Sequence, residues 1–171
     1  MTKIVKLLSF MLLSVAFLNS CQTQENAKLK RQQAITSKAE QINSNPVMLS
    51  QDNANELITL YDNYIKDYPE DTMCEYYLFQ MHNVYSAMKN CDSALYCLDR
   101  IIKEYPNGKN VGAAYFFKGV VLNDVCNNHT MSIEAFNEYI RRYPDNPHAK
   151  DAKKMIELDT MQNPIQILNH E

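Results

Sequence analysis

The feature that most constrains the fold of this chain is a ten-residue segment that recurs three times at nearly constant spacing. The copies occupy residues 60–69, 97–106 and 135–144, and each ends in Tyr-Pro. Their Tyr-Pro pairs lie 37 and then 38 residues apart. In every copy, aromatic and aliphatic residues recur at spacings of three and four before the proline, which indicates the end of a helix. A fixed period of this length predicts stacked helical units.

The residues between the prolines define the type of unit. In the repeat that starts at Glu75, the large, aromatic and small positions are occupied in turn by Leu78, Met81, Tyr85, Ala94, Leu98 and Pro106. The next repeat matches at Tyr115, Gly119, Leu122, Ser132, Phe136 and Pro144. This pattern resembles the tetratricopeptide repeat, a helix-turn-helix unit of about 34 residues. His82 departs from the pattern, because the family prefers a small residue at that position.

An earlier unit is incomplete. Leu57, Tyr61, Tyr64 and Pro69 fit a second helix, whereas the preceding segment contains Asn45-Pro46 and does not fit a first one. We therefore expect an all-α, antiparallel helix-turn-helix solenoid of about six or seven helices, in which two clear repeats follow a degenerate one.

The expected organisation has four parts. Residues 1–20 form a signal segment, residues 21–49 a tether that grades into a weak helix, and residues 162–171 a tail. The repeat domain covers residues 50–161 and ends in a capping helix from Pro147 to about Met161. At the helix starts, we expect a capping box of Thr72 with Glu75, and caps at Asp92 and Asn146.

The N-terminus carries a second informative pattern. Two lysines precede a twelve-residue, largely apolar run at residues 7–18, which is followed by Asn-Ser and then Cys21. A basic start, a short apolar core and small residues before a cleavage point are the parts of a secretory signal. The ending Leu-Asn-Ser-Cys resembles the bacterial lipobox, which implies cleavage before Cys21 and lipid attachment to it. The alternative is an uncleaved anchor helix, but a membrane span needs roughly 20 apolar residues.

The charge balance argues against two classes of partner. The chain has 17 basic and 20 acidic residues, and loss of Lys3 and Lys6 with the signal would lower the net charge from −3 to −5. This balance argues against nucleic acid, whose phosphates require basic patches. It also argues against electrostatic binding to anionic lipid, so the lipid on Cys21 is expected to hold the protein on the membrane. The three glycines are not clustered, so a phosphate-binding loop is not expected.

Four cysteines follow Cys21, at positions 74, 91, 97 and 126. An exported chain reaches an oxidising compartment, so a disulfide is allowed. The alternative is that all four are small, buried helix residues. In stacked antiparallel helices, the end of one repeat's first helix lies near the start of the preceding second helix, which brings Cys126 toward Cys91. A bond requires their Cα atoms to lie within roughly 7 Å of each other.

No residue pattern supports catalysis or a cofactor. The four histidines are dispersed along the chain. His-Glu-x-x-His and paired Cys-x-x-Cys motifs are absent, so no zinc site is expected, and Cys126 with His129 supplies only two ligands. No Gly-x-Ser-x-Gly motif supports a serine nucleophile. We expect a protein that is not an enzyme and that binds no metal or other cofactor.

The resemblance to the repeat family implies a different kind of site. In tetratricopeptide proteins, the first helices line a concave groove that binds peptides. Transferred position by position, the groove residues are Tyr76, Phe79, Asn83, Ser86, Ala87, Ala113, Phe116, Val120, Asn123 and Asp124. Aromatic rings offer a large contact area, and asparagine can bond a peptide backbone as donor and acceptor. The alternative is that these residues pack against the N-terminal segment or the capping helix.

Repeats ending in Tyr-Pro next to a lipobox resemble outer-membrane lipoproteins of the barrel-assembly machinery. They also resemble the C-terminal domain of the periplasmic protein that works with the Tol–Pal system. The chain has fewer repeats than the former and no room for the N-terminal coiled coil of the latter. The resemblance implies an outer-membrane-anchored, periplasm-facing scaffold that binds another envelope protein or peptide segment. The alternative is a structural envelope lipoprotein that self-associates into a homo-oligomer and has no peptide groove.

Overall fold

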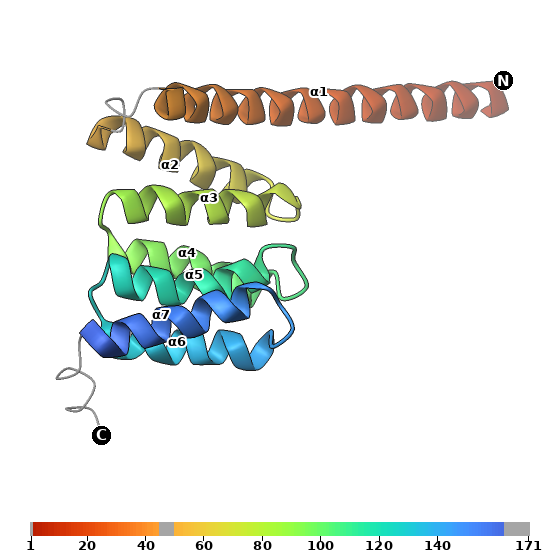
Figure 1. The fold of residues 1–171 in the computed structure, drawn as a ribbon. Helices are drawn as coiled ribbons and strands as arrows, with labels where there is room; N and C mark the ends of the chain where they lie inside the picture. Colours follow the sequence, from red (N-terminus) through yellow and green to blue (C-terminus); the bar gives the residue numbers. More distant parts are fainter. Residues whose placement is uncertain (1, 45–49, 163–171) are drawn as a thin grey trace. The chain divides into compact units, whose positions relative to one another are not determined.

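The computed structural model describes the backbone of residues 2–44 and 50–162, and the side chains of residues 22–44 and 50–162. These residues form seven α-helices and no strand, which confirms the predicted all-α class (Figure 1). The chain divides into two compact units, Met1–Lys66 and Asp67–Glu171. The side chain of Cys21, where lipid attachment is predicted, lies outside the described residues. So does the predicted tail at residues 162–171, apart from Gln162, which ends α7. Within the described residues, no helix contains a stretch that is long and apolar enough to cross a membrane.

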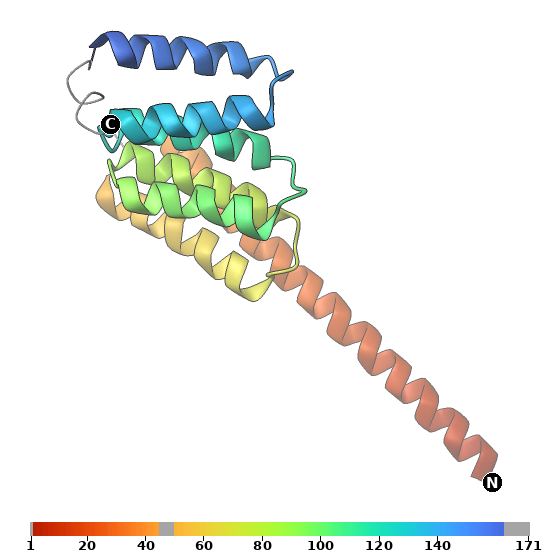
Figure 2. The same cartoon turned by 90° about the horizontal axis from the view of Figure 1, so that it is seen from below.

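The first unit consists of α1 (Thr2–Ser44) and α2 (Gln51–Asp67). The helix α1 continues without a break through residues 21–44 of the segment that was predicted to form a tether and a weak helix (Figure 2). Hydrogen bonds fasten its later part to α2. The Gln32 amide donates to the Tyr64 hydroxyl at 2.9 Å, and the Lys38 ammonium donates to the Asn53 side chain at 2.7 Å.

Burial supports the same pairing within the first unit. Ile35 and Ile42 of α1 are buried, and α2 buries Leu57, Ile58, Tyr61, Tyr64 and Ile65 along one stripe. The end of α1 therefore supplies the first helix of the repeat that the sequence left incomplete. The helix α1 reaches Ser44, and α2 begins at Gln51.

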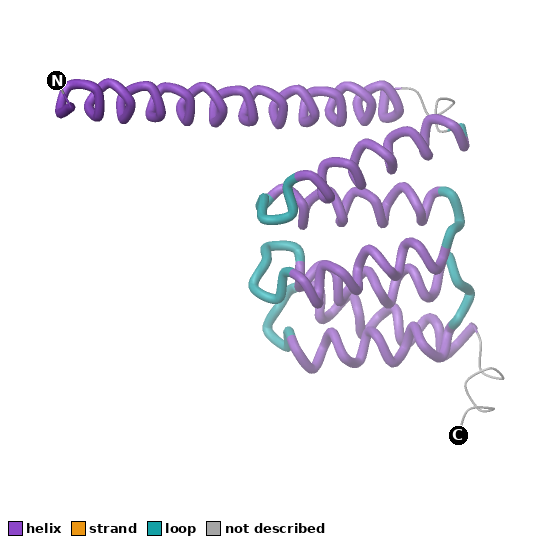
Figure 3. The backbone as a smooth tube through the Cα atoms, turned by 180° about the vertical axis from the view of Figure 1, so that it is seen from behind, coloured by secondary structure: helices purple, strands orange, loops and turns teal. Residues whose placement is uncertain are grey.

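The second unit contains α3 (Met73–Ala87), α4 (Cys91–Glu104), α5 (Val111–Asp124), α6 (His129–Arg142) and α7 (His148–Gln162). Each of these helices packs against the next one in chain order (Figure 3). This is the arrangement predicted from the repeat. The predicted positions Leu78, Ala94, Leu98 and Phe136 are all fully buried between the helices.

The small position of the repeat is occupied by different residues in the two complete repeats of the second unit. On α5, a Cβ atom at Gly119 would collide with the Phe136 ring, so the close packing of α5 and α6 requires glycine. On α3, the equivalent residue is His82, which is 1% exposed. Its Nδ1–H donates to the carbonyl of Phe79, and its ring contacts the ring of Phe117 at 5.3 Å between centroids. The histidine is therefore a core residue whose polar atom is satisfied within its own helix.

Two of the predicted caps differ in the structure. Thr72 makes no side-chain cap bond, and Glu75 turns to another helix instead of bonding back to the start of α3. At α4, Asn90 rather than Asp92 is the cap, and its side chain accepts from Ser93 N at 3.1 Å. The reason is that the chain turns at Lys89, whose φ is 58°, so Asp92 already lies inside the first helical turn.

Two further helices of this unit begin after an asparagine whose side chain accepts a hydrogen bond. Asn128 accepts from Met131 N at 3.1 Å and begins α6, directly after Asn127 with φ of 51°. Asn146 accepts from His148 N at 3.0 Å before α7, as predicted from the sequence. The second helices of the two repeats, α4 and α6, therefore begin in the same way: an asparagine caps the helix directly after a residue with positive φ.

Candidate functional site

Aromatic rings connect α3 to the start of α7 by way of α5. Phe79 on α3 contacts Phe117 on α5, with ring centroids 5.5 Å apart. The neighbouring Phe116 contacts Tyr139 on α6 at 5.3 Å and His148 on α7 at 5.7 Å. Such pairs stabilise a fold beyond the area they bury, by about 0.5–1.5 kcal/mol each. The rings therefore form a rigid apolar wall along the first helices.

A pocket of about 590 Å³ lies against this wall. It is bounded by the start of α5, the end of α6 and the start of α7. Its aromatic lining consists of Phe116, Phe117, Tyr139 and Tyr143. Gly108, Val111, Gly112 and Ala113 add small apolar surfaces, while Lys109, Asn146 and His148 supply the polar groups. A mostly apolar recess of this size with a few polar groups is typical of a binding site.

Glu75 of α3 fixes the loop that forms one side of the pocket. Its carboxylate is only 8% exposed and accepts from Lys109 N at 3.2 Å and Asn110 N at 2.5 Å. These amides stand at the start of α5, where the Asn110 side chain makes no cap bond. The carboxylate thus satisfies the start of a helix in the next repeat and complements its dipole. A Cβ atom at position 108 would collide with this carboxylate, so a larger residue there would force the Glu75 side chain to move.

The structure brings some of the predicted groove residues to the pocket. Ala113 and Phe116 line it directly. Phe116 and Val120 also pack against the buried cluster of Phe136, Tyr139 and Ala152, which includes a residue of α7. At Phe116, packing against this cluster and lining the pocket occur together, whereas Val120 packs against the cluster without lining the pocket. The two interpretations that the sequence left open are thus not exclusive on α5.

The remaining predicted positions on α3 are spread along that helix. Tyr76 is 46% exposed and Asn83 is exposed, with its amide donating to Phe79 O at 3.2 Å. Phe79 is half-buried among rings, and Ala87 is exposed at the end of α3. The Ser86 hydroxyl is buried and has no hydrogen-bond partner among the residues whose side chains are described.

The last two predicted groove residues lie at the far end of α5. Asn123 accepts from Nδ1 of His129 at 2.9 Å, and the same nitrogen lies 2.6 Å from the buried carboxylate of Asp159 on α7. Asn123 therefore helps to join α5, α6 and α7 instead of facing an open groove. Asp124 is exposed, and its carbonyl accepts from Lys89 Nζ at 3.2 Å.

Several pocket residues escaped the sequence analysis. Tyr139 belongs to the second helix α6, Tyr143 and Asn146 to the turn that follows it, and His148 to the start of α7, whereas the resemblance pointed to first helices at other positions. One available signal was the repeated Tyr-Pro pair, because Tyr143 is its third tyrosine. His148 adjoins Asp151, whose carboxylate lies 2.9 Å from its Nδ1.

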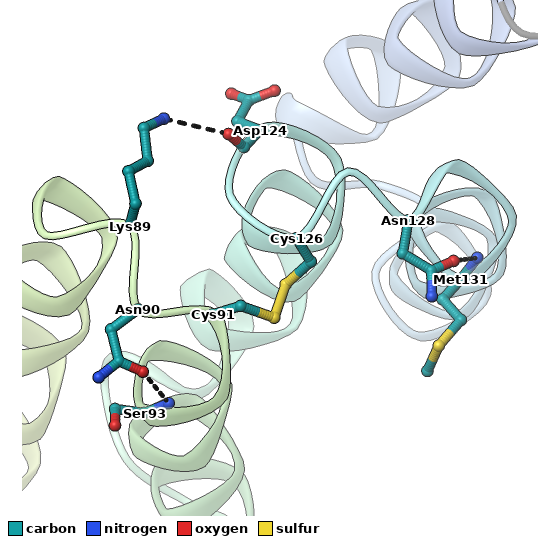
Figure 4. Close-up of a disulfide and its surroundings, with 8 residues drawn as sticks. All are labelled: Lys89, Asn90, Cys91, Ser93, Asp124, Cys126, Asn128 and Met131. Carbon is teal, nitrogen blue, oxygen red and sulfur yellow. Dashed lines mark hydrogen bonds between the residues drawn. A yellow bond between two sulfur atoms is a disulfide. The ribbon is translucent and has the colours of Figure 1, made fainter.

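A disulfide joins two neighbouring repeats. Cys91 at the start of α4 is bonded to Cys126 in the turn after α5, with Cα atoms 5.2 Å apart (Figure 4). Cys74 and Cys97 are free and buried, and burial raises the pKa of the Cys74 thiol. With Cys126 bonded, its sulfur is not available as a metal ligand beside His129. In the parts of the chain with described side chains, no group of three or more His, Cys, Asp or Glu residues could hold a metal ion.

Stacked helix pairs with these core positions define a repeat protein of the tetratricopeptide type. The family model for YfiO, described as an outer membrane lipoprotein, matches residues 34–162. Because the match covers more than half of the sequence, the chain belongs to this family of outer membrane lipoproteins. The match begins within the part of α1 that is fastened to α2 and ends with α7. No match to a curated protein was found.

Proposed function

We propose that this lipoprotein is a lipid-anchored, periplasm-facing scaffold that holds a segment of another envelope protein along α3, α5 and α7. The pocket beside Phe116 carries the proposal, because it is an apolar recess with polar groups at the helices that this repeat class uses for peptides. Lys109, Asn146 and His148 can orient a peptide through charge and hydrogen bonds, while the rings supply contact area.

The process that we assign to this scaffold follows from the family. Membership in a family of outer membrane lipoproteins supports a protein partner in the envelope. Assembly of outer-membrane proteins, or envelope maintenance of the Tol–Pal kind, is the role that we propose. The pocket is assigned to recognition and not to a reaction, so we propose no enzymatic activity and no cofactor.

Site-specific photo-cross-linking in intact cells tests the scaffold function. A photo-reactive amino acid is placed at Tyr76 on α3 or, as a matched control, at Tyr96 on α4, since both tyrosines are exposed, by 46% and 64%. The expected result is a protein adduct from position 76 that is absent from position 96. Equal adducts from both positions, or none from position 76, would contradict a groove-bound partner. Mass spectrometry of the adduct then identifies the partner.

Self-association is the second candidate function. Leu158 and Met161 on α7 are 42% and 77% exposed, which is unusual for large apolar side chains and can support contact with a second copy. Analytical ultracentrifugation of the purified protein distinguishes the two functions. A monomer at micromolar concentration favours the scaffold. A dimer that is lost in the Leu158→Glu, Met161→Glu variant favours self-association.

A further inference from the structure

The residues at the expected groove positions are apolar at the start of α5 and cationic at the corresponding positions of α7. On α5 they include Ala113 and Phe116, which line the pocket. The positions 37 residues further on are Lys150 and Lys153 of α7, and both are exposed. The core supports this alignment, because Leu122 and Asp159, which are also 37 residues apart, are both buried. The apolar surface of α5 is therefore continued on α7 by two cationic side chains.

A third lysine adds to this charge. Lys109 lines the pocket itself, at the end of the loop that Glu75 holds. We call Lys109, Lys150 and Lys153 the basic strip. It stands out in a chain whose formal net charge is −3.

The acidic groups of the helices around the pocket are engaged or lie beyond the strip. Glu75 is held by two backbone amides, and Glu138 binds the guanidinium groups of Arg141 and Arg142. Asp151 lies beside His148, and Glu157 follows the strip one turn beyond Lys153. Asp145, which is exposed in the turn between Tyr143 and Asn146, and Glu157 are the exposed acidic groups of this turn and of α7 outside these contacts, and the three exposed lysines of the strip outnumber them.

We infer that the groove takes an extended partner segment that places a large apolar side chain in the pocket and acidic side chains against the basic strip. The inference rests on the proposed function and specifies the chemistry of its partner. Packed helices lie about 8–10 Å apart, and an extended chain rises about 3.3 Å per residue. The acidic residues therefore follow the apolar one by about three positions. The pocket provides most of the contact area with the partner segment, and the lysines favour segments that carry acidic side chains.

Fluorescence anisotropy with three labelled peptides tests this chemistry on the full-length protein in detergent. The probes are SGFSGEEGS, its lysine counterpart SGFSGKKGS, and SGSSGEEGS, which lacks the aromatic anchor. The first probe is expected to bind roughly tenfold more tightly than either of the others, because each lacks one of the two features. Equal binding of the acidic and lysine probes, or tighter binding of the lysine probe, overturns the inference.

Reversing the charge of the basic strip tests the role of its lysines directly. The double variant Lys150→Glu, Lys153→Glu is expected to reverse the preference, so that the lysine probe binds more tightly. The control is Lys103→Glu, because Lys103 is exposed at the end of α4 and lines no part of the pocket. The preference is expected to survive in this variant. An unchanged preference in the double variant overturns the assignment of the basic strip.

A pocket-filling variant tests the apolar part without removing a core ring. Ala113→Leu is expected to weaken binding of the first probe by roughly tenfold, while an unchanged circular-dichroism melt shows that the fold persists.

If Tyr76 cross-links a partner in cells but the probes show no preference, the inference fails and the scaffold function stands. If Tyr76 yields only adducts with a second copy of the chain, the occupant is the protein itself, and both proposals fail.

Discussion

The carboxylate of Glu75 lies in α3, yet it satisfies backbone amides at the start of α5. A buried acceptor that serves two amides cannot be removed without leaving those amides unpaired, because little water reaches them. Gly108 is part of the same arrangement, since a larger residue there would force the Glu75 side chain to move. The shape of the pocket therefore depends on a residue that does not line it.

Replacing Glu75 tests this arrangement. Glu75→Ala is expected to lower the free energy of unfolding by about 1–3 kcal/mol, because two amides lose their acceptor. Urea denaturation measures the change. The control is Glu104→Ala, which removes a surface ion pair with Arg100 and is expected to cost less than about 1 kcal/mol. Equal losses in the two variants would contradict a special role for Glu75.

His82 makes the stability of the protein depend on pH. Burial lowers its pKa from 6.5 to about 4, against a smaller opposing effect of the bond to Phe79 O. The unfolded chain therefore binds a proton between these values that the folded chain does not. The contribution of His82 is fully present above pH 6.5 and is lost as the pH falls toward 4.

The expected loss from His82 is about 2–3 kcal/mol between pH 7 and pH 4.5. Urea denaturation at both pH values measures it as the difference between the wild type and His82→Gln, because the other groups titrate in both proteins. A wild type and a His82→Gln variant with the same pH dependence would count against a buried neutral imidazole.

The helices of the repeats could be predicted from the sequence, whereas the pairing of α1 with α2 and the contact of Glu75 with the start of α5 could not. Leu78, Ala94 and Phe136 mark core positions, because side-chain size at fixed spacing is a local property of a helix pair. The pairing of α1 with α2 has no such pattern, since it depends on Ile35, Ile42 and a hydrogen bond between residues 32 positions apart. The partners of Glu75 are backbone amides, which no side-chain pattern encodes. Of the expected groove residues, Ala113 and Phe116 line the pocket, and the pocket walls from α6 and the following turn were missed.

The disulfide links two elements, the start of α4 and the turn after α5. Its cysteines are 35 residues apart, and closing a loop of that length in the unfolded chain stabilises the fold by about 3–4 kcal/mol. The double variant Cys91→Ala, Cys126→Ala is therefore expected to melt at a lower temperature than the oxidised wild type.

Calorimetry with and without reductant checks this expectation. The reductant is expected to lower the melting temperature of the wild type and to leave that of the double variant unchanged. A wild type that is insensitive to reductant while four thiols besides Cys21 are free in denaturant would show that the bond does not form.

Family membership places the protein in the cell envelope, where we expect a lipid on Cys21 to anchor it. Metabolic labelling with an alkyne fatty acid is expected to mark the wild type and to leave Cys21→Ala unmarked, because the Cys21 thiol is the proposed attachment point. The Cys91→Ala, Cys126→Ala variant is the matched control, since it lacks two other cysteines and should still be marked. Equal labelling of Cys21→Ala and the wild type would place the lipid elsewhere or exclude it.

The bond between Cys91 and Cys126 also bears on how such a chain leaves the cytoplasm. Thiols stay reduced there, so the repeats lack this cross-link and are less stable by about 3–4 kcal/mol until the chain has crossed the inner membrane. A weakly stable precursor is easier to keep unfolded for passage through a narrow translocation channel. Oxidation on the far side then makes the stacking of the two repeats harder to reverse. The same pair of cysteines thus favours translocation on one side of the membrane and a durable fold on the other.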